Sequence, residues 1–258
     1  MSSTRRLALL LALAFATASF ALAQSSTSES SSAEPAQAPA QADQSASQGQ
    51  ISVQARIRAR RAQRRAAAIH EAYDHRYEFT TGMGYLRFVP GPGVAPGPGL
   101  EHAHEYAWDF SLTRFRDERL GYTADLRGYY ATAYVGLQPN NLNIIQGITN
   151  PAISQYAALA GPTYRFYLQP KYSVSGRLLG GIDHGNFSGD LAGGSPVLYG
   201  LWPNGNTFGI SASIPVEYNL TPRLGLRVAP EYFFSGFGST VQYTRGFTTG
   251  LTYRFGKQ

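Results

Sequence analysis

From Tyr77 to Phe255 the sequence alternates between apolar and polar residues with a period of two, which is the period of a β-strand. The alternation predicts strands of roughly ten residues each, the length of a tilted strand that crosses a membrane. The eight predicted strands are residues 77–88, 104–114, 120–130, 157–167, 172–183, 207–217, 223–234 and 244–255. No sustained helical periodicity occurs in this region, so we expect an all-β domain over 77–255.

Charged residues follow the same parity and fall on the polar face of every predicted strand. They are Glu78, Glu105, Asp109, Asp125, Arg127, Arg165, Arg177, Asp183, Glu217, Arg227, Glu231 and Arg254. Arg87 and Arg114 break the pattern, but both lie at strand ends, where a membrane interface accepts them. An arginine that faces lipid costs roughly 2–4 kcal/mol at the bilayer midplane, whereas an arginine inside a barrel can pair with a carboxylate.

The parity therefore predicts a network of ion pairs inside a barrel. Its expected members are Glu78, Asp109, Asp125, Arg127, Arg165, Arg177, Glu217, Arg227, Glu231 and Arg254. We expect these groups to make the lumen rigid.

The opposite face of the strands is rich in Tyr, Phe, Trp and Leu. A soluble eight-stranded barrel has an apolar interior, whereas a membrane barrel has an apolar outer band and a polar lumen. Aromatic residues make up 13% of the chain and charged residues only 15%, which suits the second type. The predicted fold class is all-β, an eight-stranded antiparallel up-and-down transmembrane β-barrel with a disordered, partly helical N-terminal extension.

The predicted connections between strands alternate in length. Short turns are expected at 115–119, 168–171 and 219–222, and long loops at 89–103, 131–156, 184–206 and 235–243. In bacterial barrels the short turns face the periplasm and the long loops face outward.

The N-terminus has the features of a secretory signal peptide, which we expect over residues 1–23. Arg5 and Arg6 precede an apolar stretch at 7–16, and Ala21-Leu22-Ala23 matches the small-x-small cleavage pattern. The apolar stretch is too short to span a bilayer. The protein is therefore expected to leave the cytoplasm.

Two further segments separate the signal from the barrel. Residues 24–50 are mostly Ser, Ala, Gln, Pro and acidic residues, a composition that predicts a disordered spacer. Residues 51–76 form a basic, Arg- and Ala-rich periplasmic segment in which a helix is plausible. Its arginines fall on several faces, so the segment is either a solvated tether or a contact for anionic surfaces such as lipid headgroups.

The chain contains no cysteine, which excludes disulfides, thiolate nucleophiles and Cys-ligated metal sites. Two polar groups remain as candidate sites. Asp183-His184 with Ser188 could form an acyl-transfer site, although a triad is defined by geometry and a polar loop entrance is favoured. Glu101, His102, His104 and Glu105 could contact zinc or copper, but a solvated cluster is favoured because further ordered ligands are missing. We therefore predict no catalytic residues, no cofactor and no metal.

The end of the last predicted strand resembles the C-terminal assembly signal of Gram-negative outer-membrane barrels, with Thr248, Gly250, Tyr253 and Phe255 matching in turn. The family usually ends on the aromatic residue, whereas Gly256-Lys257-Gln258 follow here. Through strand number, parity and loop asymmetry, residues 77–255 also resemble the outer-membrane β-barrel domain family related to the OmpA transmembrane domain and OmpX. That resemblance implies recognition by the barrel-assembly machinery and location in the outer membrane of a Gram-negative bacterium.

These observations predict a non-enzymatic outer-membrane protein with a structural and surface-loop interaction role. Eight strands leave an interior that side chains can fill, which predicts a narrow or closed lumen. A small porin-like channel and a lipid A-modifying enzyme are the alternatives. Expected partners are outer-membrane lipids, the barrel-assembly machinery and an extracellular ligand of the long loops. Nucleic acid is not expected.

Overall fold

The computed structural model describes residues 41–94, 99–136, 148–191 and 194–257, with side chains described from Val53 onward. The predicted signal peptide at 1–23 and the spacer as far as residue 40 lie outside the described residues. So do parts of the first three long loops.

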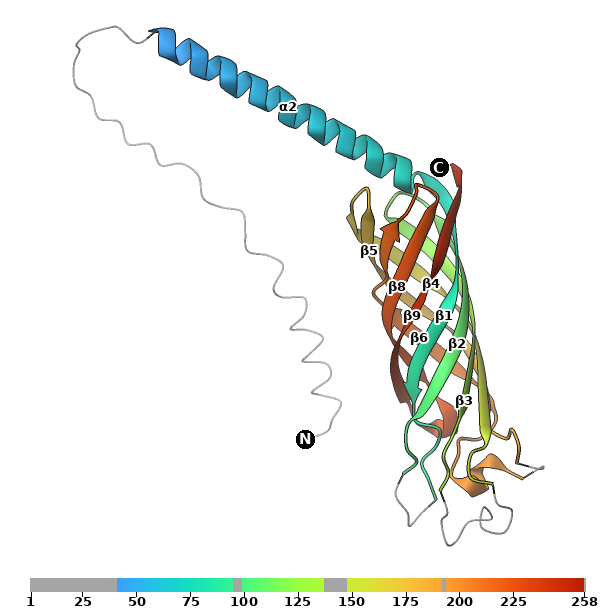
Figure 1. Ribbon diagram of the computed structural model, residues 1–258. Helices are drawn as coiled ribbons and strands as arrows, with labels where there is room; N and C mark the ends of the chain where they lie inside the picture. The colour runs from blue at the N-terminus through green and yellow to red at the C-terminus, as the bar shows by residue number, and fades with distance from the viewer. Residues whose placement is uncertain (1–40, 95–98, 137–147, 192–193, 258) are drawn as a thin grey trace. The chain divides into compact units, whose positions relative to one another are not determined.

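An antiparallel sheet closes on itself to form a barrel (Figure 1). The strands are β1 (His75–Phe88), β2 (Ala103–Phe115), β3 (Leu120–Thr132), β4 (Ala152–Leu168), β5 (Tyr172–Asn186), β6 (Gly205–Ser213), β7 (Val216–Asn219), β8 (Leu224–Ser235) and β9 (Gln242–Lys257). Strands β1 to β5 each pair with the next strand, β6 and β7 both lie between β5 and β8, and β9 pairs with β8 and with β1. Among the described residues the ring therefore has no open sheet edge. The predicted eight-stranded barrel is confirmed, because β6 and β7 share one position in the ring.

The sixth predicted strand, 207–217, is wrong as a single continuous strand. It is divided into β6 and β7 at Ile214 and Pro215. Proline has no N–H group and cannot donate to the ladder. The register across the break is nevertheless unchanged, since the Ile214 N–H donates to the Pro230 carbonyl and the Pro215 carbonyl accepts from the Ser175 N–H.

The alternation of short and long connections is confirmed. The turns after β2, β4 and β7 lie at one end of the barrel, called the short-turn end here. The loops after β1, β3, β5 and β8 lie at the opposite, long-loop end, as Figure 1 shows. These loops contain two short 3-10 helices, η1 (Pro196–Tyr199) and η2 (Phe237–Ser239). The C-terminal strand ends at the short-turn end.

One long helix, α2 (Gln41–Tyr73), precedes β1. It begins inside the segment expected to be disordered, ten residues before the predicted basic segment, and it continues into that segment. Adding a residue to an existing helix is easier than starting one, so the Ala- and Gln-containing end of the spacer extends the helix that follows. The side chains of Arg56, Arg60 and Arg64 are exposed. Among the described residues, no helix is long and apolar enough to cross a bilayer.

Candidate functional site

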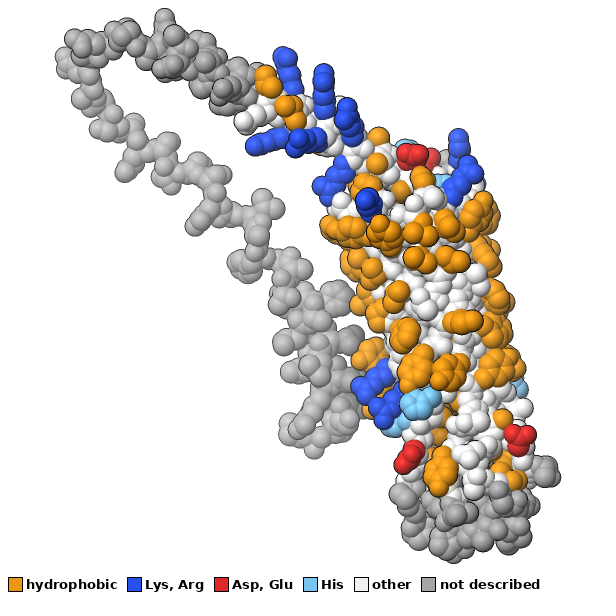
Figure 2. All heavy atoms as spheres, viewed as in Figure 1, with side chains coloured by type: hydrophobic (Ala, Val, Ile, Leu, Met, Phe, Trp, Pro, Cys, Tyr) orange, Lys and Arg blue, Asp and Glu red, His pale blue; other side chains and the backbone are white. Residues whose placement is uncertain are grey.

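The two faces of the barrel wall carry opposite kinds of side chain. On the outside, Met83, Tyr106 and Leu126 are 74%, 68% and 56% exposed. Figure 2 shows apolar side chains spread over the wall between its two ends. On the inside, all the charged side chains that parity assigned to the polar face are buried. Apolar groups on the outer wall and charges within are the distribution that lipid requires.

The fold is that of a transmembrane β-barrel.

The interior holds two clusters of ion pairs, of which the first lies near the middle of the barrel. Arg127 is 2% exposed and forms ion pairs with Asp125 and with Glu231, the latter over 2.7 Å from Nη1 to Oε2. Its Nε also lies 3.9 Å from Asp109 Oδ2. Arg177 Nη1 donates to Asp125 Oδ2 over 3.3 Å. Five side chains from β2, β3, β5 and β8 are thus joined across the lumen.

The second cluster lies closer to the short-turn end. Arg254 donates to Glu78 Oε1 over 2.5 Å and to Glu217 Oε2 over 2.6 Å. Arg227 Nε donates to the other oxygen of Glu217 over 2.6 Å, and Arg165 pairs with Glu78. The structure therefore brings together all ten residues of the predicted network. Charge-assisted hydrogen bonds of this kind are the strong ones. Most of these acids have two or three arginine partners, whereas Glu231 pairs with Arg127 alone, so removal of Arg127 would leave a buried carboxylate without its arginine.

A tyrosine from the helix is buried beside the second cluster, at the short-turn mouth. Tyr73, the last residue of α2, is fully buried, and its ring lies 5.0 Å from the guanidinium carbons of both Arg165 and Arg254. Its hydroxyl group donates to the Gln169 carbonyl over 3.0 Å and accepts from Asn219 Nδ2 over 2.7 Å. The ring face attracts both cations, so Tyr73 stabilises the arginines while it fills the short-turn mouth.

An apolar cluster from strand ends and loops lies at the long-loop mouth. Its buried members are Phe88, Ala133, Val135, Ile153, Phe187, Leu191, Tyr199, Leu201, Trp202 and Phe237. Trp202 Nε1 donates to the Val89 carbonyl over 2.8 Å, which ties the third long loop to the first. The two loops meet closely at Gly200, where φ is +75° and an added Cβ would lie 2.5 Å from the Gly93 backbone. The described parts of the first and third long loops therefore pack against each other.

Two buried acids, Glu105 and Asp183, form no ion pair with an arginine in the described part of the chain. Glu105 accepts a hydrogen bond from Gln155 Nε2 over 2.8 Å. Asp183 is fully buried, and neither carboxylate oxygen has a hydrogen-bond partner within the described part of the chain. Apolar side chains that include Leu86, Tyr129 and Phe233 form a buried cluster in this part of the lumen, and Leu86 lies directly opposite Glu105 in the strand register. A buried carboxylate without a partner is destabilising.

Neither candidate catalytic nor candidate metal group is assembled. Asp183 points into the lumen, whereas His184 is exposed and bonds to Asn206 Oδ1 over 2.6 Å. Ser188 bonds instead to Asn186 and Asn204. The group at 101–105 is divided in the same way, because Glu105 faces inward and His104 faces outward. Among the described residues, no three His, Asp or Glu side chains are placed to hold a metal ion.

The residues that resemble an assembly signal lie on β9, the strand that closes the barrel. Thr248 faces the lumen, whereas Tyr253 and Phe255 face outward and stack on each other with ring centroids 6.0 Å apart. Gly250 lies opposite Gly82 on β1, and a Cβ at Gly250 would come within 2.3 Å of the Thr81 carbonyl oxygen. The glycine is therefore needed for close approach of the first and last strands.

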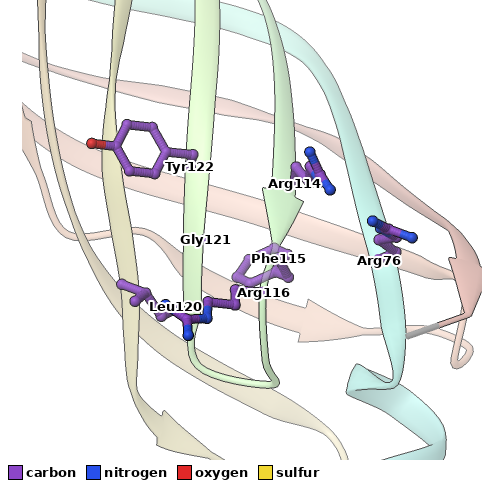
Figure 3. Close-up of a pocket in the computed structure, with 7 residues that line it drawn as sticks. All are labelled: Arg76, Arg114, Phe115, Arg116, Leu120, Gly121 and Tyr122. Atoms are coloured by element: carbon purple, nitrogen blue, oxygen red, sulfur yellow. The ribbon is translucent and has the colours of Figure 1, made fainter.

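A hollow of about 600 Å³ lies on the outer wall at the short-turn end. It is lined by Arg76, Arg114, Phe115, Arg116, Leu120, Gly121 and Tyr122. Figure 3 shows the side chains of Arg114 on β2 and Arg76 on β1 extending toward each other. Arg114 is exposed and is the second-last residue of β2. It thus lies at a strand end, where the membrane interface accepts an outward arginine.

No protein-family model matches the chain, and no curated protein matches its sequence. Comparison with solved structures finds outer-membrane proteins. Neisserial surface protein A is 13% identical, and the match covers 69% of this chain and 97% of that one with a TM-score of 0.43. OprG from Pseudomonas aeruginosa is 11% identical, with 71% and 98% covered and a TM-score of 0.43. Ail of Yersinia pestis, solved with the heparin analogue sucrose octasulfate, is 12% identical, with 69% and 97% covered and a TM-score of 0.41. None of these similarities assigns an activity or a ligand to this chain.

Proposed function

We propose that this chain is a non-enzymatic outer-membrane protein whose barrel is closed and whose long loops serve interactions at the cell surface. The observation that carries the proposal is the filled lumen. Five acids and five arginines pair across it, Tyr73 occupies one mouth, and the cluster around Trp202 occupies the other. A path for solutes would require at least one of these groups to move.

The proposed orientation follows from the two ends of the barrel. The short turns, together with the Tyr73 end of α2, face the periplasm, and the long loops face outward. A signal peptide at 1–23 would supply the export that this orientation needs. The outward aromatic side chains contact outer-membrane lipids, and β9 is the strand that the barrel-assembly machinery would recognise. An extracellular ligand would meet the long loops.

Location is tested by cell fractionation and by gel migration with and without heating. We expect the chain in the outer-membrane fraction, as a compact band that shifts when the sample is boiled. Recovery in the soluble fraction would contradict the proposal.

The closed lumen is tested by current recordings in planar bilayers. The folded chain is expected to give no stable conductance steps. Two variants are compared with the unaltered chain. The double variant Tyr73→Ala with Trp202→Ala removes a large side chain from each mouth, and the control variant Tyr106→Ala removes a ring from the outer wall. Steps from the unaltered chain would favour the porin-like alternative.

The absence of enzymatic activity is tested on lipid A. Cells with and without the protein are expected to have the same acyl composition of lipid A. A change that is lost with Ser188→Ala or His184→Ala would restore the enzyme alternative, and a change that both variants retain would place such an activity elsewhere in the chain.

A further inference from the structure

A row of nitrogen-bearing side chains crosses three neighbouring strands on the outer wall. In the strand register, Arg87 on β1 lies directly opposite His104 on β2 and directly opposite Arg245 on β9. All three side chains are exposed, and so is His102, which precedes β2. Figure 2 shows the basic and histidine side chains gathered on the wall toward the long-loop end. We call Arg87, Arg245, His102 and His104 the outer cationic cluster.

The outer cationic cluster lacks the negative charge that would balance it. Like charges placed opposite each other on paired strands are destabilising. Among the described residues, no carboxylate forms an ion pair with Arg87, Arg245 or His104. The positive charges of the cluster act on His102. Partial burial is the largest cause that lowers the pKa of His102, and the charges of Arg87 and Arg245 lower it further. An anion would relieve this repulsion.

An aromatic row lies immediately beneath the cluster. Tyr85 on β1 is opposite Tyr106 on β2 and opposite Phe247 on β9, and its ring centroid is 6.1 Å from each of theirs. Met83 lies two residues before Tyr85 on the same outer face of β1, nearer to the middle of the barrel wall. Two residues along a strand span about 7 Å, so the surface changes from apolar to cationic over that distance. Such a change marks the level where lipid chains meet lipid headgroups.

The arginines at the other end of the wall have a different setting. Beside Arg114 and Arg116, the turn after β2 contains the acids Asp117 and Glu118. The Asp117 carboxylate accepts hydrogen bonds from the backbone N–H groups of Arg119 and Leu120. These hydrogen bonds are the main cause that lowers the pKa of Asp117, and the charges of nearby arginines lower it further. Negative charge is thus built into the short-turn end. At the outer cationic cluster the nearest exposed acid in the chain is Glu101, which forms no ion pair among the described residues.

We propose that the outer cationic cluster binds the phosphorylated headgroup of a lipid in the outward-facing leaflet, with its acyl chains against Tyr85, Tyr106 and Phe247. The proposal rests on the proposed function, because it requires the long-loop end to face the outer leaflet. Arg87 and Arg245 supply the fixed charge. His104 is held beside them by a hydrogen bond between its Nδ1 and the Tyr85 hydroxyl group. Lipid A has the required chemistry, with phosphate on a multiply acylated headgroup.

Binding is tested on the purified full chain, folded in detergent micelles, with three probes. These are lipid A with its phosphates, lipid A from which the phosphates have been removed, and inorganic phosphate. The test variant is Arg87→Gln with Arg245→Gln. The control is Arg76→Gln with Arg114→Gln, which removes the same charge at the short-turn end. Gel migration shows that each variant has folded.

We expect the test variant to bind phosphorylated lipid A about thirtyfold more weakly, since each arginine near an anionic surface contributes roughly a factor of five. The control variant is expected to bind as the unaltered chain does. Equal binding of lipid A without phosphates, or equal losses in the two variants, would overturn the proposal. Saturation by inorganic phosphate at the same concentration as the lipid would also overturn it, by showing a site for a free anion.

The two proposals can fail separately. A chain that is recovered in the outer membrane but whose test variant binds normally would refute the cluster and leave the proposed function standing. A chain absent from the outer membrane would refute the proposed function, whatever the purified protein binds.

Discussion

The hydroxyl group of Tyr73 accepts a hydrogen bond of 2.7 Å from Asn219 Nδ2, which joins the last residue of α2 to the last residue of β7. The same hydroxyl group donates to the Gln169 carbonyl in the turn after β4. One side chain from outside the barrel therefore connects two short turns and covers Arg165 and Arg254. The end of the helix is therefore packed into the short-turn end of the barrel.

Removing the Tyr73 ring should destabilise the barrel strongly. Loss of a buried aromatic side chain typically lowers the free energy of unfolding by about 3–5 kcal/mol. Tyr73→Phe keeps the ring over the two arginines and should lose less, about 1–3 kcal/mol, for the two hydrogen bonds of the hydroxyl group. Urea-induced unfolding of the barrel in lipid vesicles measures both. Equal losses for Tyr73→Ala and Tyr73→Phe would show that the ring contributes nothing.

Breaking the central ion-pair cluster should also be costly. Arg127→Gln leaves Asp125 and Glu231 without their main partner, and removal of one member of a buried pair lowers the free energy of unfolding by about 3–5 kcal/mol. Adding Glu231→Gln should recover part of that loss, because the two changes share one interaction. A double-mutant cycle on unfolding in vesicles measures the coupling. Strictly additive losses would contradict a direct pair.

Asp183→Asn is expected to stabilise the barrel. Both carboxylate oxygens are buried without a hydrogen-bond partner among the described residues, so the charge is a liability of about 1–3 kcal/mol. Asp125→Asn is the matched control and should destabilise, because Asp125 pairs with Arg127 and Arg177. Midpoints of urea unfolding compare the two. If Asp183→Asn lost as much stability as the control, the carboxylate would have to be engaged by a partner.

The contact between the helix and the first short turn should weaken as pH rises. The Glu118 hydrogen bond to His70 Nδ1, at 2.7 Å, raises the pKa of His70 above its usual 6.5, and Asp74 adds to this. A raised pKa means that the contact is fully present below about pH 6.5 and is lost as pH rises through the higher value in the folded state. NMR titration of the His70 ring measures its pKa in the folded chain. Glu118→Gln should return the pKa toward 6.5, and a pKa at or below 6.5 in the unaltered chain would refute the contact.

The alternation of residues predicted which side chains of the barrel wall face the lumen, but it did not predict which of them pair with each other. The inward direction of Arg127 and Glu231 follows from alternation along each strand, but their pairing depends on which strands meet across the lumen. The break at Pro215 was signalled by the proline itself, although the alternation continues through it. Gly82 and Gly250 are close because the first and last strands pair, which no local pattern shows.

The burial of Tyr73 and Trp202 at the two mouths could not be predicted from the sequence pattern. Tyr73 ends a helix without an apolar stripe, and Trp202 lies in a loop, so neither residue has a periodic signal. Both are buried by contacts between segments far apart in the chain. Trp202 and Val89 are joined across 113 residues, and Tyr73 and Asn219 across 146. Tyr73 stands out in the sequence as an aromatic residue in a polar setting, whereas Trp202 lies beside apolar residues such as Leu201 and Pro203.

The central claim, charges inside and apolar groups outside, is tested most directly by spin labels at neighbouring positions. The chain has no cysteine, so single substitutions at Ser111, Leu112, Thr123 and Ala124 each give one label. Ser111 and Thr123 are buried, whereas Leu112 and Ala124 are exposed on the wall. With the barrel in lipid vesicles, labels at 112 and 124 should collide readily with oxygen dissolved in the bilayer, and labels at 111 and 123 should not. The reverse pattern, with 111 and 123 in lipid, would contradict the account.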